Sequence, residues 1–360
     1  MKERVVVAMS GGVDSSVAAA LLKSQGYEVI GITMCFNLPD SVTKKPSCCG
    51  VKGIEDARRV AHKLGIKHYV LNFSKVLQEK VIKEFCREYA KGRTPNPCIR
   101  CNQFLKFDAL LKKALSLDAK YLATGHYARV EKAASRKPQA ARYLLKKAKD
   151  SKKDQSYFLY RLNQKQLKSI LFPLGDYTKE EVRNFARDFA LPVADKIGSQ
   201  EICFVPDADY RRFLTSQGKA NIKPGPVVDK NNNILGEHKG VAFYTIGQRE
   251  GLGIARGYPV YVIKIDAKNN RIVVGEKEDV YAGGFMLKAA HFIHPSFKKK
   301  VAPMVKIRYN HAEAPARITF VKNKMKVKFR QPQFAVTPGQ SAVFYDKDTV
   351  LGGGFIEEII

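Results

Sequence analysis

Two glycines, three hydroxyls and a carboxylate stand together near the start of the chain, in Ser10-Gly11-Gly12-Val13-Asp14-Ser15-Ser16. An apolar run, residues 5–9, comes before them, and a helix-like run, residues 17–22, follows. At such a strand–turn–helix junction the first N–H groups of the helix have no internal partner, and the helix dipole favours an anion. The segment predicts a phosphate cradle, with a plain Gly-Gly turn as the alternative.

The loop lacks the lysine followed by Ser or Thr that ends a Walker P-loop. It resembles instead the pyrophosphate loop of the ATP-pyrophosphatase superfamily, written SGGxDSS. The resemblance implies that ATP is split between its α and β phosphates and that a carbonyl or carboxylate oxygen is adenylated.

The thiols form the second group with chemical potential. The chain has seven cysteines, at positions 35, 48, 49, 86, 98, 101 and 203. This odd count, without a secretion signal, argues against a structural disulfide framework. Cys98 and Cys101 form a C-x-x-C pattern between residues 95 and 102, where two prolines predict an extended loop rather than a helix.

The C-x-x-C spacing fits half of a metal site, a redox pair, or a nucleophile with a bystander. The basic neighbours Arg93 and Arg100 would lower a thiol pKa, which favours the nucleophile. Cys203, in SQEICFV, is by itself typical of a buried structural thiol.

Alternating strand-like and helix-like runs fill the first 130 residues and would position these groups. Strands are predicted at residues 5–9, 28–34, 68–73 and 121–125, with helices between them. Such alternation predicts an α/β fold with a parallel sheet, whose ligands lie beyond the carboxyl ends of the strands. The glycine loop, Met34 and Gly125-His126 all fall at such ends. Thr178 and Glu181 predict a capping box at the start of a later helix.

From residue 223 the pattern changes to short β runs with Gly, Pro and Asn turns. This predicts three domains: an N-terminal catalytic domain at residues 1–215, a small β-rich linking domain at 216–276, and a β-barrel-like domain at 277–360.

The net charge of +29 over 360 residues favours a polyanionic partner, with a generally basic proteome as the alternative. Residues 132–153 are rich in Lys and Arg and predict a loop or hairpin that orders on a partner; Lys298, Lys299 and Lys300 form a second cluster. A third set alternates with mostly apolar residues at strand spacing: Lys322, Lys324, Lys326, Lys328 and Arg330. This predicts a strand with one basic face, which is either the solvated outside of a barrel or a phosphate-binding stripe.

No stretch approaches the ~20 apolar residues of a membrane span, and residues 5–9 are too short for a signal peptide. We therefore expect a cytoplasmic protein.

Six motifs occur in a fixed order: SGGVDSS, RTPNPCIRCN, ATGHYAR, KKDQSYFLY, SQEICFV and YTIGQREGLGI. In this the chain resembles the bacterial tRNA-specific 2-thiouridylases, from Ser10 to about Ile254 and more weakly beyond. The resemblance implies an adenine nucleotide α-hydrolase-like domain, a linking domain and a C-terminal β-barrel. It also implies ATP-dependent placement of sulfur on C2 of the wobble uridine, U34, in tRNAs for Lys, Glu and Gln.

The resemblance implies roles for individual residues. Cys101 would be the catalytic nucleophile and Cys203 the persulfide carrier, joined in a transient Cys101–Cys203 disulfide. The implied nucleotide-binding residues are Ala8, Met9, Ser10, Gly11, Gly12, Val13, Asp14, Ser15, Met34 and Gly125. The implied tRNA-binding residues are Asn96, Pro97 and Cys98 at the target base, and His126, Lys153, Asp154, Gln155, Arg308, Tyr309 and Gln340.

One position departs from part of the family. Some members have an aspartate where this chain has Cys98, and that aspartate is proposed as an acid/base group. Cys98 is therefore either a bystander or a third participant in thiol exchange.

The implied cofactors are ATP and Mg²⁺. The sequence contains no direct binding motif for the metal. Asp14 is a candidate to position it, and a helix cap is the alternative role for that side chain. The implied sulfur donor is a relay protein or a cysteine desulfurase. The persulfide either attacks C2 directly or is first cleaved by Cys101 to free sulfide.

Two other functions remain open at this point. One is a ligase-type relative similar to argininosuccinate synthase, against which the paired thiols and positive charge argue. The other is a non-catalytic RNA-binding protein with a relic nucleotide fold, which would bind tRNA in a salt-sensitive way but release no pyrophosphate.

Overall fold

The computed structural model describes residues 2–36, 51–133, 142–198, 202–205, 209–218, 222–294, 297, 302–321 and 324–360. Several residues singled out above lie outside these ranges: Cys48, Cys49, Lys298, Lys299, Lys300 and Lys322. The chain forms two compact units. The N-terminal unit comprises Met1–Val81, Cys98–Asp209 and Asp348–Val350, and the C-terminal unit comprises Ile82–Pro97, Tyr210–Lys347 and Leu351–Ile360.

A five-stranded sheet organises the N-terminal unit, in the order β3-β2-β1-β4-β7. Its strands are β1 (Arg4–Ala8), β2 (Glu28–Cys35), β3 (Lys67–Asn72), β4 (Tyr121–Thr124) and β7 (Ile170–Leu171). Every pairing in it is parallel. The parallel sheet predicted from the sequence is confirmed, and its carboxyl ends lie along one edge.

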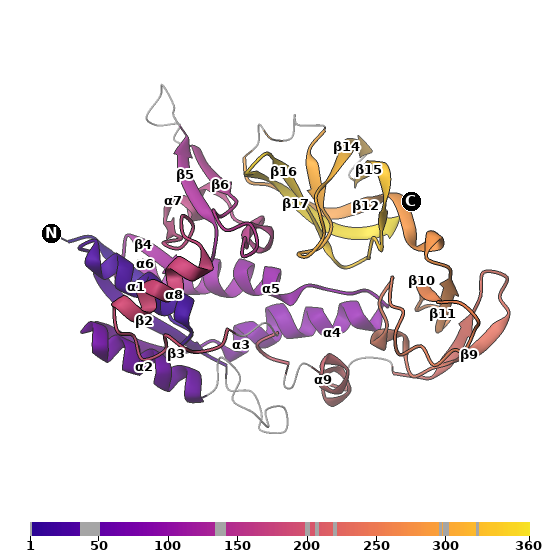
Figure 1. Ribbon diagram of the computed structural model, residues 1–360, viewed down its shortest axis with the longest axis horizontal. Coiled ribbons are helices and arrows are strands. Elements are labelled where there is room, and N and C mark those ends of the chain that lie inside the picture. Colours follow the sequence, from indigo (N-terminus) through magenta and orange to yellow (C-terminus); the bar gives the residue numbers. More distant parts are fainter. Residues whose placement is uncertain are drawn as a thin grey trace. The chain divides into compact units, whose positions relative to one another are not determined.

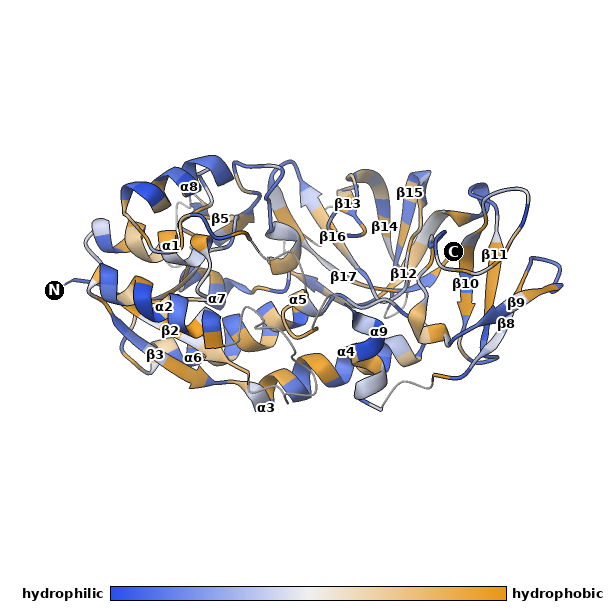
Figure 2. Cartoon of the chain, turned by 60° about the horizontal axis from the view of Figure 1, so that its bottom comes forward, coloured by the Kyte–Doolittle hydropathy of each residue, from blue (hydrophilic) through white to orange (hydrophobic). Residues whose placement is uncertain are grey.

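Three helices share a core with β1: α1 (Val13–Ser24), α2 (Val51–Leu64) and α8 (Lys179–Asp188). In α1 the residues from Val17 to Leu22 are all buried, as expected for an alanine-rich apolar helix. The outer helices α2 and α8 show hydrophilic residues in Figure 2. The predicted capping box of α8 is confirmed, because Thr178 Oγ1 accepts the Glu181 N–H and the Glu181 carboxylate accepts the Thr178 N–H.

The C-x-x-C segment is helical, which makes the prediction of an extended loop wrong. Pro97 begins α5 (Pro97–Arg100), which continues into the π-helix η2 (Cys101–Leu110) and then α6 (Leu111–Leu115). Proline is well suited to the first position of a helix, because the N–H that it lacks would have no partner there and its φ is preset. Both thiols therefore project from the first turns of a helix.

Short elements complete the N-terminal unit. The basic segment forms an antiparallel hairpin of β5 (Arg129–Ala133) and β6 (Arg142–Lys146). The hairpin is followed by the 3₁₀ turn η4 (Ser156–Leu159) and α7 (Gln164–Lys168). Two further pieces, α3 (Ser74–Leu77) and the π-helix η1 (Gln78–Ile82), precede α4 (Lys83–Ala90), which belongs to the C-terminal unit.

The C-terminal unit contains a four-stranded sheet in the order β10-β11-β8-β9. These strands are β8 (Gly225–Val228), β9 (Ile234–His238), β10 (Tyr261–Asp266) and β11 (Arg271–Gly275). Val227, Val262 and Val274 are buried in its core together with Tyr244 and Leu252. The shorter helices of this unit are α9 (Tyr210–Ser216), η6 (Val241–Phe243) and η7 (Glu278–Val280).

Six further strands form a closed antiparallel barrel in the order β12-β15-β14-β13-β16-β17, with β12 also paired to β17 (Figure 1). They are β12 (Tyr281–Phe292), β13 (Met304–Lys306), β14 (Ala314–Val321), β15 (Lys324–Phe334), β16 (Ser341–Asp346) and β17 (Thr349–Ile359). In β15, Met325, Val327 and Phe329 are buried, whereas Lys324, Lys328 and Arg330 are exposed. The basic face of the predicted strand is therefore the outside of the barrel.

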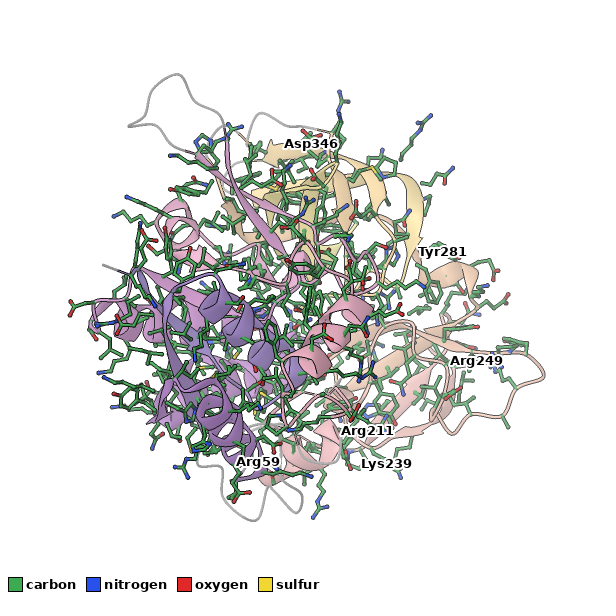
Figure 3. All side chains as sticks on the ribbon, turned by 60° about the vertical axis from the view of Figure 1, so that its left-hand side comes forward. Arg59, Arg211, Lys239, Arg249, Tyr281 and Asp346 are labelled. Atoms are coloured by element: carbon green, nitrogen blue, oxygen red, sulfur yellow. The ribbon has the colours of Figure 1, made fainter. Side chains whose placement is uncertain are left out.

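Exposed basic side chains occur in both units, for example Arg59 on α2, Arg211 on α9 and Arg249 in the loop before β10 (Figure 3). Within the described ranges, no helix has the length and the apolar character needed to cross a membrane.

Candidate active site

The glycine loop joins the carboxyl end of β1 to α1. Ala8 ends the strand, in register with Ile32 of β2 and Thr124 of β4. Gly11 has φ +72°, and a Cβ there would lie 2.1 Å from the Gly53 carbonyl oxygen of α2. Gly12 is the N-cap of α1 and contributes no side chain. The loop therefore leads, without side chains at Gly11 and Gly12, into a helix N-terminus, and helix N-termini after glycine-rich loops bind phosphate.

Hydroxyls within the loop hold its conformation. Ser15 Oγ accepts the Ser10 N–H at 3.2 Å, and the Ser15 and Ser16 hydroxyls donate to the Gly12 carbonyl at 3.2 and 2.8 Å. Ser15 and Ser16 are buried, whereas Ser10 is exposed. These bonds pre-organise the cradle before any ligand arrives.

Residues that the sequence did not indicate also hold the loop in place through hydrogen bonds and an ion pair. Lys196 Nζ donates to the Gly11 carbonyl at 2.9 Å and pairs with Asp56 of α2 at 2.6 Å. Asp56 is 2% exposed and also binds Arg59. Burial alone would raise the pKa of Asp56, but the hydrogen bonds from Lys196 and Arg59 outweigh it and hold this pKa below its usual range. The partners are 140 residues apart, so no local spacing could reveal them.

Asp14 lies in the first turn of α1, and its carboxylate is held by other side chains. Its Oδ1 accepts the Tyr127 hydroxyl at 2.9 Å and pairs with Lys179 Nζ at 2.5 Å. The alternative role as helix cap is wrong, since Gly12 occupies the N-cap and no side-chain cap bond forms. Burial, followed by the negative charge of Asp14, raises the pKa of Tyr127 and keeps its phenol protonated as a donor.

The donor set gives Mg²⁺ only partial support. Asp14 offers one carboxylate that remains partly exposed, and Lys179 already pairs with it. The residues that the structure describes hold no group of three His, Cys, Asp or Glu side chains that could bind a metal ion. The metal stays a prediction.

The predicted nucleotide contacts on the neighbouring strands lie at the same edge of the sheet. Met34 is half-buried near the end of β2, where Thr33 Oγ1 donates to the Met9 carbonyl at 2.8 Å. Gly125 directly follows β4, and a Cβ there would lie 2.7 Å from the backbone of Asp14 and Ser15. The structure therefore brings the loop, Met34 and Gly125 together at the carboxyl ends of β1, β2 and β4.

The candidate nucleophile starts the π-helical segment. Cys101 is half-buried, and Cys98, one turn earlier in α5, is exposed. Asn102 Nδ2 donates to the Phe158 carbonyl at 3.2 Å and fixes this end of the helix on η4. Arg100 donates to Gln103 Oε1 at 2.9 Å. The helix therefore holds both thiols firmly within the N-terminal unit.

Cys203 is also in the N-terminal unit and is half-buried. Among the described residues, no disulfide joins it to another cysteine, and the same holds for Cys35, Cys86, Cys98 and Cys101. Residues 199–201 and 206–208 on either side of it lie outside the described ranges. The transient Cys101–Cys203 disulfide stays a prediction.

The segment 153–155, predicted to bind tRNA, is divided between exposed and buried side chains. Lys153 is exposed, but Asp154 is 7% exposed and accepts the backbone N–H groups of Ala148 and Ser156. Gln155 Oε1 accepts the Tyr127 N–H at 3.1 Å. Lys153 is thus the member of the segment best placed for a phosphate, while Asp154 and Gln155 shape the turn.

His126 follows Gly125 and is also largely buried, at 9% exposure. Its Nδ1 lies 2.7 Å from Thr124 Oγ1, and its Nε2 lies 3.3 Å from Lys106 Nζ. Burial, followed by the charge of Lys106, holds the pKa of His126 well below its usual range. The ring is therefore neutral and has little surface for a direct tRNA contact.

The remaining predicted tRNA contacts belong to the C-terminal unit. There Gln340 Nε2 donates to the Thr94 carbonyl at 2.8 Å, two residues before Asn96. Arg308 donates to the Phe334 carbonyl at 2.9 Å, and Tyr309 lies under Lys306, with 5.5 Å from Nζ to the ring centroid. Within this unit Gln340 therefore anchors the segment that leads to Asn96 and Pro97.

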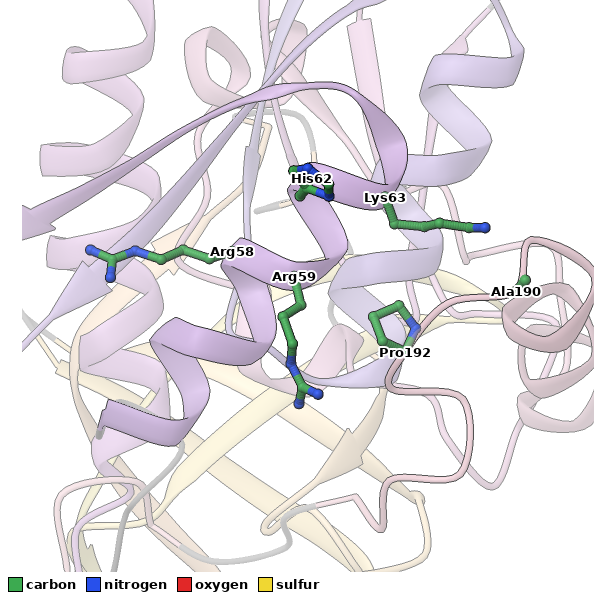
Figure 4. A pocket seen from close by; sticks show the side chains of 6 residues that line it. All are labelled: Arg58, Arg59, His62, Lys63, Ala190 and Pro192. Carbon is green, nitrogen blue, oxygen red and sulfur yellow. The ribbon is translucent and has the colours of Figure 1, made fainter.

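An open basic pocket lies on α2 (Figure 4). Its lining residues are Arg58, Arg59, His62, Lys63, Ala190 and Pro192. The four basic residues occupy the C-terminal half of α2, and Ala190 and Pro192 follow α8, whereas Gly53, which contacts the glycine loop, lies in the first turn of α2. The pocket is thus separate from the phosphate cradle.

Comparison with known proteins gives matches along nearly the whole chain. Three family models match in succession: the tRNA methyl transferase HUP domain at residues 3–207, the tRNA methyl transferase PRC-barrel domain at 211–276, and the aminomethyltransferase beta-barrel domain at 282–356. A tRNA-specific 2-thiouridylase MnmA of Halothermothrix orenii is 54% identical over 99% of both chains. One of Carboxydothermus hydrogenoformans is 50% identical over 99% of this chain and 98% of its own.

Solved structures match less closely. A 4-thiouridine synthetase in complex with RNA and bound ATP covers 60% of this chain and 50% of its own, at 18% identity and a TM-score of 0.36.

Proposed function

The chain belongs to the tRNA-specific 2-thiouridylase family, and on that premise we propose that it exchanges the C2 oxygen of the wobble uridine, U34, for sulfur in tRNAs for Lys, Glu and Gln. It is a sulfurtransferase that acts on tRNA, as its full-length relatives at 50–54% identity are named. The observation that carries the site assignment is the convergence of the glycine loop, Met34 and Gly125 at one sheet edge, in the same unit as both candidate thiols.

The nucleotide in this proposal is ATP, whose use fits the family. Ala8 to Ser15 would hold its phosphates through backbone N–H groups and the dipole of α1, with Met34 and Gly125 against the rest of the nucleotide. A Cβ at Gly11 would collide with the backbone of α2, and one at Gly125 with the backbone of α1, so tight packing fixes the position of the loop.

The first chemical step activates a poor electrophile. Uridine O2 attacks the α-phosphorus of ATP, the O2–Pα bond forms, and the bond from Pα to the oxygen bridging to the β-phosphate breaks. Pyrophosphate leaves with the electron pair, and the N3 proton of the uracil passes to water. The loop N–H groups and the α1 dipole would stabilise the charge on the departing pyrophosphate.

The second step delivers sulfur. A relay protein or cysteine desulfurase would load Cys203 with a persulfide, whose terminal sulfur attacks C2 as AMP leaves with the oxygen. Cys101 would attack the remaining sulfur bond to give a Cys101–Cys203 disulfide, or would first release the terminal sulfur as sulfide. In both routes a dithiol reductant must then supply two electrons to reduce the Cys101–Cys203 disulfide to the two thiols. Cys98, exposed one turn from Cys101, is either a bystander or a partner in this exchange.

Each unit carries residues that we propose to contact the tRNA. Lys153, the basic face of β15 and the residues Arg308, Tyr309 and Gln340 would bind the tRNA, and Asn96, Pro97 and Cys98 would face an extruded U34. We further propose a catalytic domain at residues 1–215, a linking domain at 216–276 and a barrel at 277–360, in a protein of the cytoplasm.

Single-cysteine variants test this assignment. Cys101→Ser and Cys203→Ser should each abolish sulfur incorporation into tRNA while leaving tRNA affinity unchanged, because neither thiol is needed for phosphate contacts. Cys98→Ser serves as the matched control in the same helix and should keep substantial activity. Full activity of Cys203→Ser with a persulfide donor would contradict the relay, and complete loss in Cys98→Ser would make that thiol a participant.

A further inference from the structure

A lysine with no assigned role connects the helix of the candidate nucleophile to His126, which follows Gly125 beside the nucleotide loop. Lys106 is half-buried in the π-helix η2, five residues after Cys101. A π-helix is joined by i→i+5 hydrogen bonds, so residues five apart stand one turn above the other. Lys106 is therefore stacked one turn beyond the thiol, and π-helical turns occur frequently at functional sites.

The ammonium of Lys106 is aimed by His126. Its Nζ lies 3.3 Å from Nε2 of that ring. A lysine ammonium only donates hydrogen bonds, so Nε2 accepts, and the proton of the neutral imidazole stays on Nδ1 and is donated to Thr124 Oγ1 at 2.7 Å. The ring cannot turn away, because Phe107 and Phe172 pack on it with centroids 5.8 and 5.9 Å away.

The same pair adjoins the phosphate cradle. Thr124 is in register with Ala8, the last residue before the loop. Gly125, between Thr124 and His126, lies against the backbone of Asp14 and Ser15. His126 is therefore the residue next to Gly125, where the chain after β4 contacts the first turn of α1.

No carboxylate in the described part of the chain forms an ion pair with this lysine. Among the described residues the ion pairs of the neighbourhood use Asp14, Asp56 and Asp108, with Lys179, Lys196 and Lys112 as their partners, and none uses Lys106. A half-buried cation with only a neutral acceptor is stabilised best by an anionic ligand. Burial also keeps the pKa of His126 low, so that ring remains an acceptor at neutral pH.

We infer that Lys106, positioned by His126, binds the α-phosphate of ATP and stabilises the negative charge that develops on its oxygens when uridine O2 attacks. Lys106 is a catalytic residue in this assignment and His126 a positioning residue. The inference rests on the proposed adenylation step. It adds no bond to that step: Lys106 remains an ammonium throughout and exchanges no proton with the substrate.

The test compares Lys106→Gln with Lys113→Gln, which removes a charge from an exposed position on the following helix. Single-turnover release of pyrophosphate is measured with ATP and cognate tRNA. Lys106→Gln should slow it about 100-fold, as for loss of one transition-state donor, and Lys113→Gln should leave it unchanged. The affinity for α,β-methylene-ATP and the rate of Cys101 alkylation, followed by mass spectrometry, should stay within about threefold of wild type, because the contact tightens mainly in the transition state.

His126 variants separate positioning from a structural role. His126→Gln keeps an acceptor near the Nε2 position and should retain most of the rate, whereas His126→Phe fits the aromatic surroundings but offers no acceptor and should approach Lys106→Gln. Circular dichroism melts verify that both variants fold.

Three results would overturn the inference. One is wild-type pyrophosphate release in Lys106→Gln, and another is a slowed alkylation of Cys101 with normal release, which would assign the charge to the thiol. The third is a wild-type enzyme that releases no pyrophosphate with any tRNA, which refutes the proposed adenylation itself and is recognised before any variant is made.

Discussion

Asp56 shows how a single residue supports the site from a distance. It is a buried carboxylate that serves the loop: Lys196 links it to the Gly11 carbonyl, and Arg59 completes the pair. Removing one partner of a buried ion pair reduces the stability of the protein far more than removing one partner of a surface pair. The loop conformation is therefore coupled to the stability of α2.

Lys196→Met should destabilise the protein by about 1–3 kcal/mol, because Asp56 keeps only Arg59 and the Gly11 carbonyl loses a donor. Urea unfolding measures the change, and ATP affinity should fall in parallel. The double variant Asp56→Asn/Lys196→Met should recover part of the loss, since no unpaired charge remains. If the loss of unfolding free energy in the double variant equals the sum of the losses in the two single variants, the coupling is contradicted.

Two imidazoles, that of buried His126 and that of half-buried His68, predict the pH dependence of the N-terminal unit. Burial, and then nearby Lys106 or Arg58, lowers the pKa of His126 and His68. Above pH ~6.5 both states of the chain carry neutral imidazoles; below it the unfolded chain binds protons that the folded chain does not. The free energy of unfolding should therefore fall as pH decreases from ~6.5, by up to about 1.4 kcal/mol per pH unit for each histidine. His126→Phe should flatten this slope, and an unchanged slope would show that His126 already titrates normally in the folded state.

At the scale of elements, the site is made by strand ends and helix starts. The carboxyl ends of β1, β2 and β4, the start of α1 and the start of α5 each supply one candidate group. The order of strands and helices, the loop and the capping box follow from local patterns in the sequence. The helical state of the Cys98–Cys101 segment did not, since two prolines look the same before a helix and in a loop. The contact of Asn102 with Phe158, which holds this helix, joins residues 56 apart and leaves no local signal.

Gly11→Ala and Gly26→Ala form a matched pair for the loop. Both glycines have a positive φ, at +72° and +89°, but a Cβ at Gly11 would meet the Gly53 carbonyl oxygen at 2.1 Å, whereas nothing lies within 4 Å at Gly26. Gly26→Ala should cost about 1 kcal/mol through backbone strain alone. Gly11→Ala should in addition reduce ATP affinity more than tenfold, measured by calorimetry, because α2 or the loop must move. Equal ATP affinity in the two variants would exclude the tight loop–α2 contact.

At the scale of the whole molecule, the net charge of +29 is the property that sequence alone shows most plainly. It predicts a polyanionic partner without saying which face binds it. The structure adds that Lys324, Lys328 and Arg330 of β15 are exposed on the outside of the barrel. Two contacts could not be predicted from the sequence: the ion pair of Lys196 with Asp56 and the hydrogen bond of Lys106 with His126. Both join residues that are far apart in the sequence through their side chains only.

Replacing Lys324, Lys328 and Arg330 with Gln should weaken tRNA binding and reduce the slope of log affinity against log salt by about 0.7–0.9 for each phosphate that these side chains neutralise. Filter binding at several salt concentrations measures the slope. The control is Lys112→Gln/Lys113→Gln on α6, which should leave the slope unchanged. An unaltered slope in the β15 variant would assign this face to solvent rather than to tRNA.

The central claim is that this protein activates and thiolates U34, and nucleoside mass spectrometry tests it most directly. Unmodified tRNA for Lys, Glu or Gln is incubated with the protein, ATP, Mg²⁺ and a persulfide donor, then digested to nucleosides. The account predicts one sulfur-for-oxygen exchange at U34 that depends on ATP and is accompanied by equimolar pyrophosphate. Salt-sensitive tRNA binding with neither thiolated uridine nor pyrophosphate would contradict it.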